Sequence, residues 1–245
     1  MADITYSHLS DIDARAAVAV YTALMVMLDD QEVYHKVGAE HFAQMLCGGS
    51  ALDDQGPLGQ AAKVLADMGQ HFSPFGTTTI VSSTLRAMCG EMLCNPSNPF
   101  SVEPQSKKFI DYHKSLTGYS EAFAMFIRCK ADFPVETAYI HVLSEICFFI
   151  DHANDILSFY KEDLDEDATS YIHCGARIAG RSPRDILFEL IDEVVAAAEH
   201  VREHLGEGRA RDAWDKFEAN YMWFHFDNPR YRLREVVDAG YYTVN

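Results

Sequence analysis

Basic residues are scarce in this sequence. Its 245 residues include 20 Lys and Arg against 37 Asp and Glu, which gives a formal net charge of −17 at pH 7. A surface this acidic repels nucleic-acid phosphates and anionic membrane surfaces, so the composition argues against a general nucleic-acid-binding function. If the protein binds a phosphorylated ligand, it must recruit cations or gather its few Lys and Arg side chains at one place.

Signals for membranes or secretion are also absent. Residues 1–13 carry three acids and no base, without the positive and apolar regions of a signal peptide, and no apolar run approaches membrane-spanning length. The six cysteines have no C-x-x-C spacing, so free thiols are expected. We therefore expect a cytoplasmic protein without a membrane anchor.

Strand-type alternation, internal repeats and linkers are missing too, which predicts an all-α fold with residues 1–245 forming one compact helical domain. Pro134 and Ser182–Pro183 are typical of helix starts. Gly118 inside a helix costs about 1 kcal/mol relative to Ala and therefore indicates a kink or a close approach. Composition predicts a loop at 95–99 and a break at 228–229. The predicted helices are 14–33, 36–46 (stopped by Gly48 and Gly49), 58–72, 77–93, 105–128, 134–162, 183–205 and 209–226.

One helix face is rich in oxygen ligands. Asn154, Ser158 and Glu162 are spaced i, i+4, i+8, so they lie one turn apart on the same side of a helix. An amide, a hydroxyl and a carboxylate are hard-oxygen ligands that suit Mg²⁺. A solvated polar face is the alternative, but the preceding turns at 146–150 are apolar, which favours an interior position.

A second acidic element ends the predicted helix 14–33. Asp29, Asp30 and Glu32 follow an apolar run, where carboxylates are costly unless they are exposed or bind a metal. Alone, this acidic end is most simply a solvated surface. Together with the oxygen-rich face, it predicts two helix walls that hold a cluster of Mg²⁺ ions.

These two elements resemble the Asp-rich motif and the N-D-x-x-S-x-x-x-E motif of class I terpene synthases. The segment Asn154–Glu162 is similar to its counterpart in the trichodiene synthase-like fungal branch, and its distance from Asp29 fits that branch. Arg230 and Tyr231 resemble the Arg-Tyr pair of the same branch. The resemblance covers about residues 15 to 236 and implies the helical isoprenoid synthase fold.

The resemblance implies three Mg²⁺ ions, for which Mn²⁺ can substitute. Asp29 would bind two of them with support from Asp30, and Asn154, Ser158 and Glu162 would bind the third. The last acid of the Asp-rich motif is absent here, a departure that this branch tolerates.

The family also uses an arginine diphosphate sensor shortly before a helix-breaking Gly. When this sequence is aligned with the family on Gly118, Lys114 occupies the sensor position, and Thr117 occupies the linker position between Lys114 and Gly118. Lysine keeps the charge but loses the bidentate geometry, and His113 is a neighbouring candidate. The residues that the resemblance assigns to binding and ionising the diphosphate are Lys114, Lys161, Arg230 and Tyr231.

The implied reaction ionises geranyl and/or farnesyl diphosphate, and aromatic faces stabilise the resulting cation. The pocket candidates, each equally explained by ordinary core packing, are Tyr21, Met25, Gly118, Phe148, Phe149, Tyr221 and Phe224. The chain is shorter than family members at both ends, so we expect water to enter and give linalool or nerolidol. A cyclic sesquiterpene of the trichodiene or cuprenene type is the alternative product. Many members are homodimers, and a homodimer is compatible with this sequence.

Other functions remain open at this point. A chain-elongating prenyltransferase would carry D-D-x-x-D in both motifs, and a helical phosphohydrolase would need further ligands beside Asp151 and His152. A catalytically weak terpene synthase homologue would still bind Mg²⁺ and diphosphate. A non-enzymatic helical interaction protein would bind neither, so thermal stabilisation by the two together would separate these last two.

Overall fold

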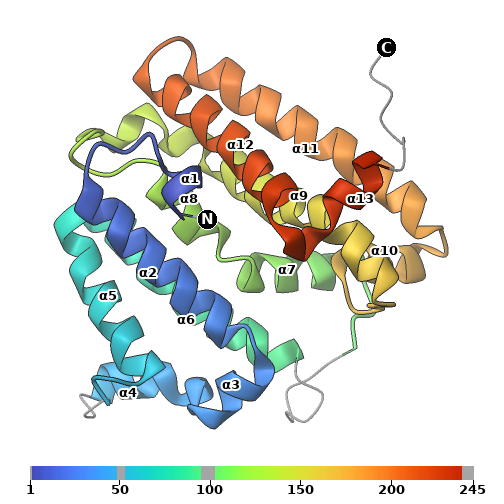
Figure 1. The fold of residues 1–245 in the computed structure, drawn as a ribbon, viewed down its shortest axis with the longest axis horizontal. Helices are drawn as coiled ribbons and strands as arrows, with labels where there is room; N and C mark the ends of the chain where they lie inside the picture. Colours follow the sequence, from blue (N-terminus) through green and yellow to red (C-terminus); the bar gives the residue numbers. More distant parts are fainter. Residues whose placement is uncertain (1, 49–52, 95–102, 239–245) are drawn as a thin grey trace.

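The structure is a computed structural model that describes residues 2–48, 53–94 and 103–238. Within these ranges the chain is helical and forms no strand, which confirms the all-α prediction (Figure 1). Gly49 and the loop predicted at 95–99 lie outside the described residues. No helix in the described ranges has the length and apolar character needed to cross a membrane.

The elements of the first half are α1 Ala2–Thr5, α2 Ile12–Leu28, α3 Gln31–Lys36, η1 Ala39–His41, α4 Phe42–Gly48, α5 Pro57–His71, α6 Pro74–Cys94, α7 Lys107–Thr117 and α8 Ser120–Phe126. Those of the second half are η2 Glu136–Ala138, η3 Ile140–Val142, α9 Leu143–Leu164, α10 Tyr171–Ala179, α11 Pro183–Leu205, α12 Arg209–Asp227, η4 Pro229–Tyr231 and α13 Leu233–Asp238, where η denotes a 3₁₀ turn.

Helix starts and stops follow the local chemistry at several predicted positions. The Ser182 hydroxyl accepts the Asp185 N–H at 3.2 Å, which confirms the predicted start of α11. The break predicted at 228–229 is also confirmed, because α12 ends at Asp227 and the 3₁₀ turn η4 follows. The predicted kink at Gly118 is a full break between α7 and α8.

Three predicted helices are wrong in extent. The helix 14–33 stops at Leu28, because Asp30 takes an extended conformation and its side chain caps α3. The helix 134–162 begins only at Leu143, after two 3₁₀ turns. Tyr139 lies between these turns, and its buried ring stacks on the Arg128 guanidinium at 4.5 Å. The helix 36–46 is divided between the end of α3, η1 and α4, and the short helices α1, α10 and α13 were not predicted.

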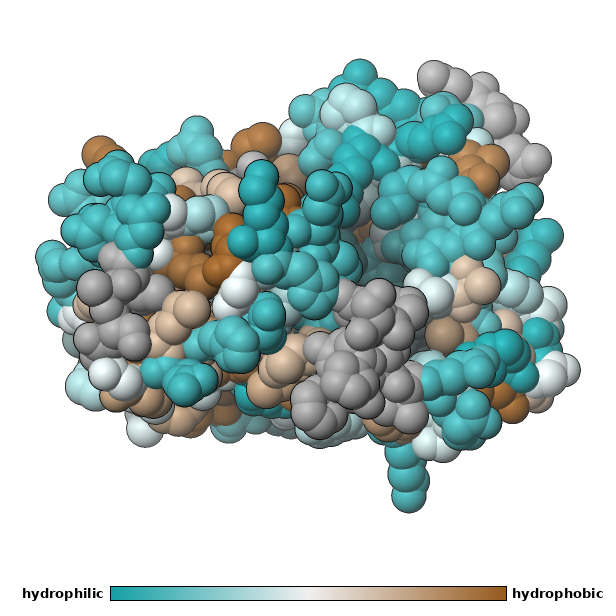
Figure 2. All heavy atoms as spheres, turned by 90° about the horizontal axis from the view of Figure 1, so that it is seen from below, coloured by the Kyte–Doolittle hydropathy of each residue, from teal (hydrophilic) through white to brown (hydrophobic). Residues whose placement is uncertain are grey.

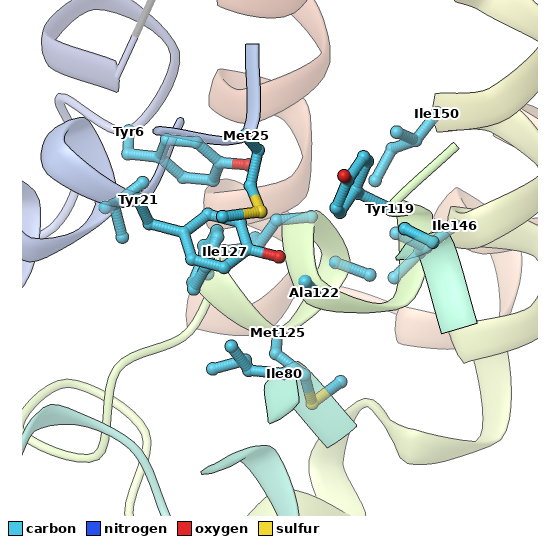
Figure 3. Close-up of a cluster of buried hydrophobic side chains, with 14 of the residues drawn as sticks. Tyr6, Tyr21, Met25, Ile80, Tyr119, Ala122, Met125, Ile127, Ile146 and Ile150 are labelled. Carbon is cyan, nitrogen blue, oxygen red and sulfur yellow. The ribbon is translucent and has the colours of Figure 1, made fainter. Parts of the chain in front are cut away.

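The helices form two groups with α7 and α8 between them (Figure 1). In one group α2 packs on α5, and α5 packs on α6; in the other, α9 packs on α11, and α11 packs on α12. Helix α8 contacts both α6 and α9, so the break at Gly118 lies at the centre of the molecule. Figure 3 shows the buried side chains gathered there, with Tyr21 and Met25 of α2 facing Tyr119 and Ile150.

Candidate active site

A cleft between the C-terminal end of α2 and the middle of α9 has two adjoining compartments. The inner cavity has a volume of about 260 Å³, and the acidic pocket next to it has a volume of about 310 Å³. Asp29, Lys114, Thr117 and Asn154 line both compartments. The face seen in Figure 2 is hollowed between hydrophilic side chains.

Asn154, Ser158 and Glu162 follow one another along α9, as predicted, but they do not reach the cleft equally. Asn154 and Glu162 line the acidic pocket, whereas Ser158 is buried and its hydroxyl donates to the Asp155 carbonyl at 3.4 Å. The Asn154 amide donates to His225 Nε2 at 3.4 Å, since His225 Nδ1 already donates to the Tyr221 carbonyl. The side chain of Asn154 is therefore oriented before any ligand binds.

Lys114, the predicted sensor, belongs to a buried network on the α9 side. Its ammonium lies 2.6 Å from one oxygen of Asp155, and His152 Nδ1 donates to the other oxygen at 2.9 Å. Burial alone would lower the pKa of Lys114, but the carboxylates of Asp155 and Asp151 outweigh it and raise that pKa. Lys114 therefore remains a cation inside the protein. His113 lines the acidic pocket, and its Nε2 lies 3.3 Å from the Gly90 carbonyl.

On the α2 side of the cleft, Asp29 lacks the kind of charged and hydrogen-bonded partners that Asp155 has, as far as the described residues extend. Among the described residues, the Asp29 carboxylate has neither a hydrogen bond nor an ion pair. The surrounding protein desolvates it and raises its pKa, against the opposing charges of Arg230, Lys114 and Lys161. Asp30 behaves differently, because one of its oxygens accepts the N–H groups of the first turn of α3 at 2.9 and 3.1 Å.

Glu91 of α6 is a third acid at the same end of the cleft. Its side chain is 4% exposed, lines the acidic pocket and accepts a hydrogen bond from the Gln31 amide at 2.5 Å. Burial, together with the nearby charge of Asp29, raises the pKa of Glu91 to about 8. Glu91 is therefore largely protonated at neutral pH in this structure.

The break between α7 and α8 brings a carboxylate against the helix backbone. A Cβ atom placed on Gly118 would lie 1.7 Å from Asp151 Oδ1, so only glycine leaves room for this contact. Ser120 donates to Asp151 Oδ2 at 2.8 Å, while Oδ1 is buried and has no hydrogen-bond partner in the described part of the chain. Burial raises the pKa of Asp151 to about 6, although the charge of Lys114 opposes that shift. The expectation of a close approach at Gly118 is thereby confirmed.

The remaining predicted diphosphate-binding residues lie around the mouth. Arg230 is exposed and lines the inner cavity, and Tyr231 is buried beside it with its ring 4.4 Å from that of His225. Lys161 is partly buried, and its ammonium lies 3.8 Å from Glu162 Oε1. Lys161 lines neither the inner cavity nor the acidic pocket.

The predicted pocket residues are divided between the inner cavity and other parts of the core. Met25, Gly118 and Tyr221 line the cavity. Tyr21 does not, since it is fully buried with its hydroxyl 2.8 Å from that of Thr84. Phe148, Phe149 and Phe224 also lie elsewhere, against His152, Trp214 and Tyr231 respectively. The aromatic side chains that do line the cavity are Tyr119, Phe123, Tyr221 and Tyr231.

The oxygen donors of the acidic pocket fit Mg²⁺ in kind. Asp29 faces it from α2, and Asn154 and Glu162 from α9. No group of three or more His, Cys, Asp or Glu side chains in the described ranges is arranged to hold a metal by itself. Mg²⁺ normally takes few protein ligands and completes its shell with water and phosphate oxygens, so the donor set is consistent with an ion that binds together with a diphosphate.

Several contacts in and beside this cleft were not predicted from the sequence. His152 and Asp155 are spaced i, i+3, so their contact on one helix face was readable from the sequence. The partner Lys114 comes from another helix, 41 residues away in sequence, and had no local signal. Glu91 and Tyr119 likewise had no signal, because an acid in α6 or a tyrosine after Gly118 reaches the cleft only through the fold.

Comparison with known proteins identifies relatives along almost the whole chain. A family model described as trichodiene synthase matches residues 3–242. Monoterpene synthase 25 of Postia placenta is 36% identical over 236 residues, which is 96% of this chain and 71% of that protein. Terpene synthase 29 of the same fungus is 36% identical over 97% of this chain and 69% of its own length. Alpha-cuprenene synthase COP6 of Coprinopsis cinerea is 30% identical over 95% of this chain and 71% of its own length.

Proposed function

This chain belongs to the trichodiene synthase family of terpene synthases, and on that premise we propose that it ionises geranyl and/or farnesyl diphosphate with the help of Mg²⁺. The products are diphosphate and an allylic carbocation that reacts on to a terpene. The observation that supports this most directly is the acidic pocket, where Asp29 and the pair Asn154 and Glu162 face one another from α2 and α9 beside the cationic Lys114.

Charge is the first requirement of such a reaction. Bound Mg²⁺, held by Asp29 on one wall and by Asn154 and Glu162 on the other, would supply positive charge that neutralises the leaving diphosphate. Lys114 and Arg230 line the compartment next to this pocket and are positioned to donate hydrogen bonds to diphosphate oxygens.

Lys161 is the third cation near this site. Its positive charge acts to lower the pKa of Asp29, and it lies next to Glu162 on α9. We assign it to the diphosphate together with Tyr231, which is buried and lines the inner cavity beside Arg230. Arg230 is exposed, so it can move towards a ligand at low cost, whereas Lys114 must leave Asp155 or share its ammonium with it.

The prenyl chain occupies the inner cavity in this proposal. Met25, Phe123 and Ile150 give that cavity apolar walls, and the rings of Tyr119 and Tyr221 add aromatic faces. An aromatic ring stabilises a nearby cation by about 0.5–2 kcal/mol, depending on how well water is excluded. Two product classes follow: an acyclic tertiary alcohol such as linalool or nerolidol if water adds early, and a cyclic sesquiterpene if it does not.

A turnover assay tests the proposal. The purified protein is incubated with geranyl or farnesyl diphosphate, with and without Mg²⁺, and diphosphate release and volatile products are measured. We expect Mg²⁺-dependent terpenes that are lost in Asp29→Ala and Asn154→Ala. Asp192→Ala, which removes an exposed acid of α11, is the matched control and should leave turnover unchanged. Absence of Mg²⁺-dependent conversion of both substrates would contradict the proposal.

A further inference from the structure

Lys114 lies where three compartments adjoin. It lines the inner cavity, the acidic pocket and a third pocket of about 370 Å³ between α7, α8 and α9. An ammonium carries three N–H donors on a flexible stem, so a lysine needs a fixed acceptor if it is to point in one direction. Asp155 Oδ1 lies 2.6 Å from the ammonium and takes one of these donors. The other two remain for a ligand, so Lys114 can donate to a diphosphate without leaving Asp155.

Asp155 is itself held in place by His152. Its Oδ2 accepts a hydrogen bond from His152 Nδ1 at 2.9 Å, while Oδ1 is bound to Lys114. The side chains of Asp155 and His152 are only 9% and 8% exposed, so little water reaches either contact. With one oxygen on each partner, Asp155 cannot rotate without leaving a buried polar group unpaired, which is costly. The hydrogen bond from His152 therefore fixes the direction in which Asp155 holds the ammonium.

Two aromatic rings hold His152. Its ring centroid lies 4.4 Å from that of Phe148 on α9 and 4.6 Å from that of Tyr171, the first residue of α10. The Tyr171 hydroxyl in turn donates to Asp111 Oδ1 at 2.7 Å and accepts from Lys107 Nζ at 2.7 Å, and both of these residues belong to α7. Helix α10 packs against both α7 and α9 (Figure 1). The position of His152 is therefore tied to the helix that carries the ammonium.

We propose that His152 is a positioning residue for the ionisation step: by holding Asp155, it directs the Lys114 ammonium towards the oxygens of the diphosphate. This inference rests on the proposed ionisation of a prenyl diphosphate. His152 lines neither the inner cavity nor the acidic pocket, so it acts through Lys114 and does not touch the substrate. Because a lysine lacks the bidentate geometry of an arginine, its direction has to come from such neighbours.

The direction of the ammonium matters most when the C–O bond of the substrate breaks. Negative charge grows on the diphosphate as it leaves, so a correctly placed donor stabilises the transition state more than the bound substrate. Binding of the substrate itself depends mainly on Mg²⁺ and Arg230 in the proposed function. A misdirected Lys114 should therefore lower kcat for diphosphate release by about tenfold or more, and change KM by less than about threefold.

Two substitutions of His152 separate positioning from packing. His152→Asn keeps an N–H donor where Nδ1 lies but loses the ring, whereas His152→Phe keeps a ring between Phe148 and Tyr171 but loses the donor. We expect His152→Phe to lower kcat by about tenfold or more with KM within about threefold, and His152→Asn to keep kcat within about threefold. A residue needed only for packing would give the reverse order. His71→Phe is the matched control, because His71 Nδ1 lies 3.2 Å from an Asp11 oxygen away from the cleft, and both parameters should stay unchanged.

A double-mutant cycle shows whether His152 acts through Lys114. In Lys114→Met there is no ammonium to direct, so adding His152→Phe should lower kcat by less than about a further twofold. If His152→Phe is too unstable to assay, Asp155→Asn replaces it in the cycle with the same expectation. If the double variant has no measurable turnover, the order of His152→Asn and His152→Phe decides.

Several outcomes overturn the inference. It fails if His152→Phe keeps the kcat of the unmodified protein, or if His152→Asn loses as much kcat as His152→Phe. It also fails if the effects of His152→Phe and Lys114→Met multiply, because the two residues then act independently. Absence of diphosphate release by the unmodified protein from both substrates instead refutes the proposed function, and the inference falls with it.

Discussion

On the α9 wall of the cleft, the carboxylate of Asp155 has two partners, Lys114 at 2.6 Å and His152 at 2.9 Å. On the α2 wall, the carboxylate of Asp29 has neither a hydrogen bond nor an ion pair within the described part of the chain, and burial raises its pKa. Both are acids in one cleft, yet one is neutralised by the fold and the other is not. A carboxylate that the fold leaves unpaired is suited to a cation that arrives from outside.

The same contrast follows from where each acid lies on its helix. Asp155 is in the interior of α9, where neighbouring turns place His152 beside it and α7 supplies Lys114. Asp29 lies at the end of α2, where the chain turns away into α3 and no following turn supports its side chain. The α9 wall is thus arranged before a ligand binds, and the α2 wall is completed by one.

The largest expected effect concerns Asp29. Asp29→Asn should lower turnover of a prenyl diphosphate by about 100-fold or more, since it removes charge on which the leaving group depends. It should not lower the melting temperature of the protein without ligand, because the raised pKa of Asp29 means that its charge is unfavourable in the folded state. Diphosphate release measures the first effect, and thermal melting without ligand measures the second. A lower melting temperature without ligand would show that Asp29 has a stabilising partner after all.

Lys114→Met should behave in the opposite way. Removing the ammonium leaves the buried Asp155 with His152 as its main partner, which we expect to cost about 3 kcal/mol of unfolding free energy. Urea unfolding in the absence of ligand measures this loss directly. Lys63→Met is the control, because Lys63 forms an exposed pair with Asp54 and its loss should cost less than about 1 kcal/mol. Equal effects of the two substitutions would remove the distinction between the walls.

Glu91 tests the comparison of the two walls through the pH dependence of the protein's stability. Its pKa is raised to about 8, so between pH 4.5 and 8 the folded state binds more protons than the unfolded state. The contribution of Glu91 to stability is therefore greatest below that window and falls as pH rises through it, by at most about 1.4 kcal/mol per pH unit. Glu91→Gln should flatten this part of the curve, as measured by urea unfolding from pH 5 to 8 without metal. A slope that survives the substitution must come from another group, such as the nearby Asp29.

The two walls also differ in how far the sequence alone predicts them. The motif face of α9 is local, so the spacing of Asn154 and Glu162 was sufficient to place both at one pocket. The caps at Ser182 and the break at Gly118 were predictable for the same reason, since each depends on a few adjacent residues. The all-α fold followed from helical periodicity along the whole chain.

Contacts between distant segments had no such signal. The pairing of Lys114 with Asp155 requires α7 to pack beside α9, and the position of Glu91 requires α6 to reach the end of α2. Ser158 illustrates the converse: it has the right spacing, yet it is buried, bonds the Asp155 carbonyl and does not line the pocket. Spacing therefore predicts which residues share a face, while packing decides which of them reach a ligand.

The smallest predicted effect concerns Asp30, and it tests whether Asp30 has a different role from its neighbour Asp29. Asp30 was predicted to support the metal site, and the structure shows one of its oxygens capping α3 through the N–H groups of Glu32 and Val33. Asp30→Ala should cost about 1 kcal/mol of stability through loss of the cap, whereas Asp30→Ser, which can also cap, should restore most of it. If Asp30 acts only as a cap, Asp30→Ser also keeps turnover and the melting shift caused by Mg²⁺ and diphosphate. A serine variant that is stable but has lost the melting shift would instead place Asp30 with Asp29 on the metal-binding wall.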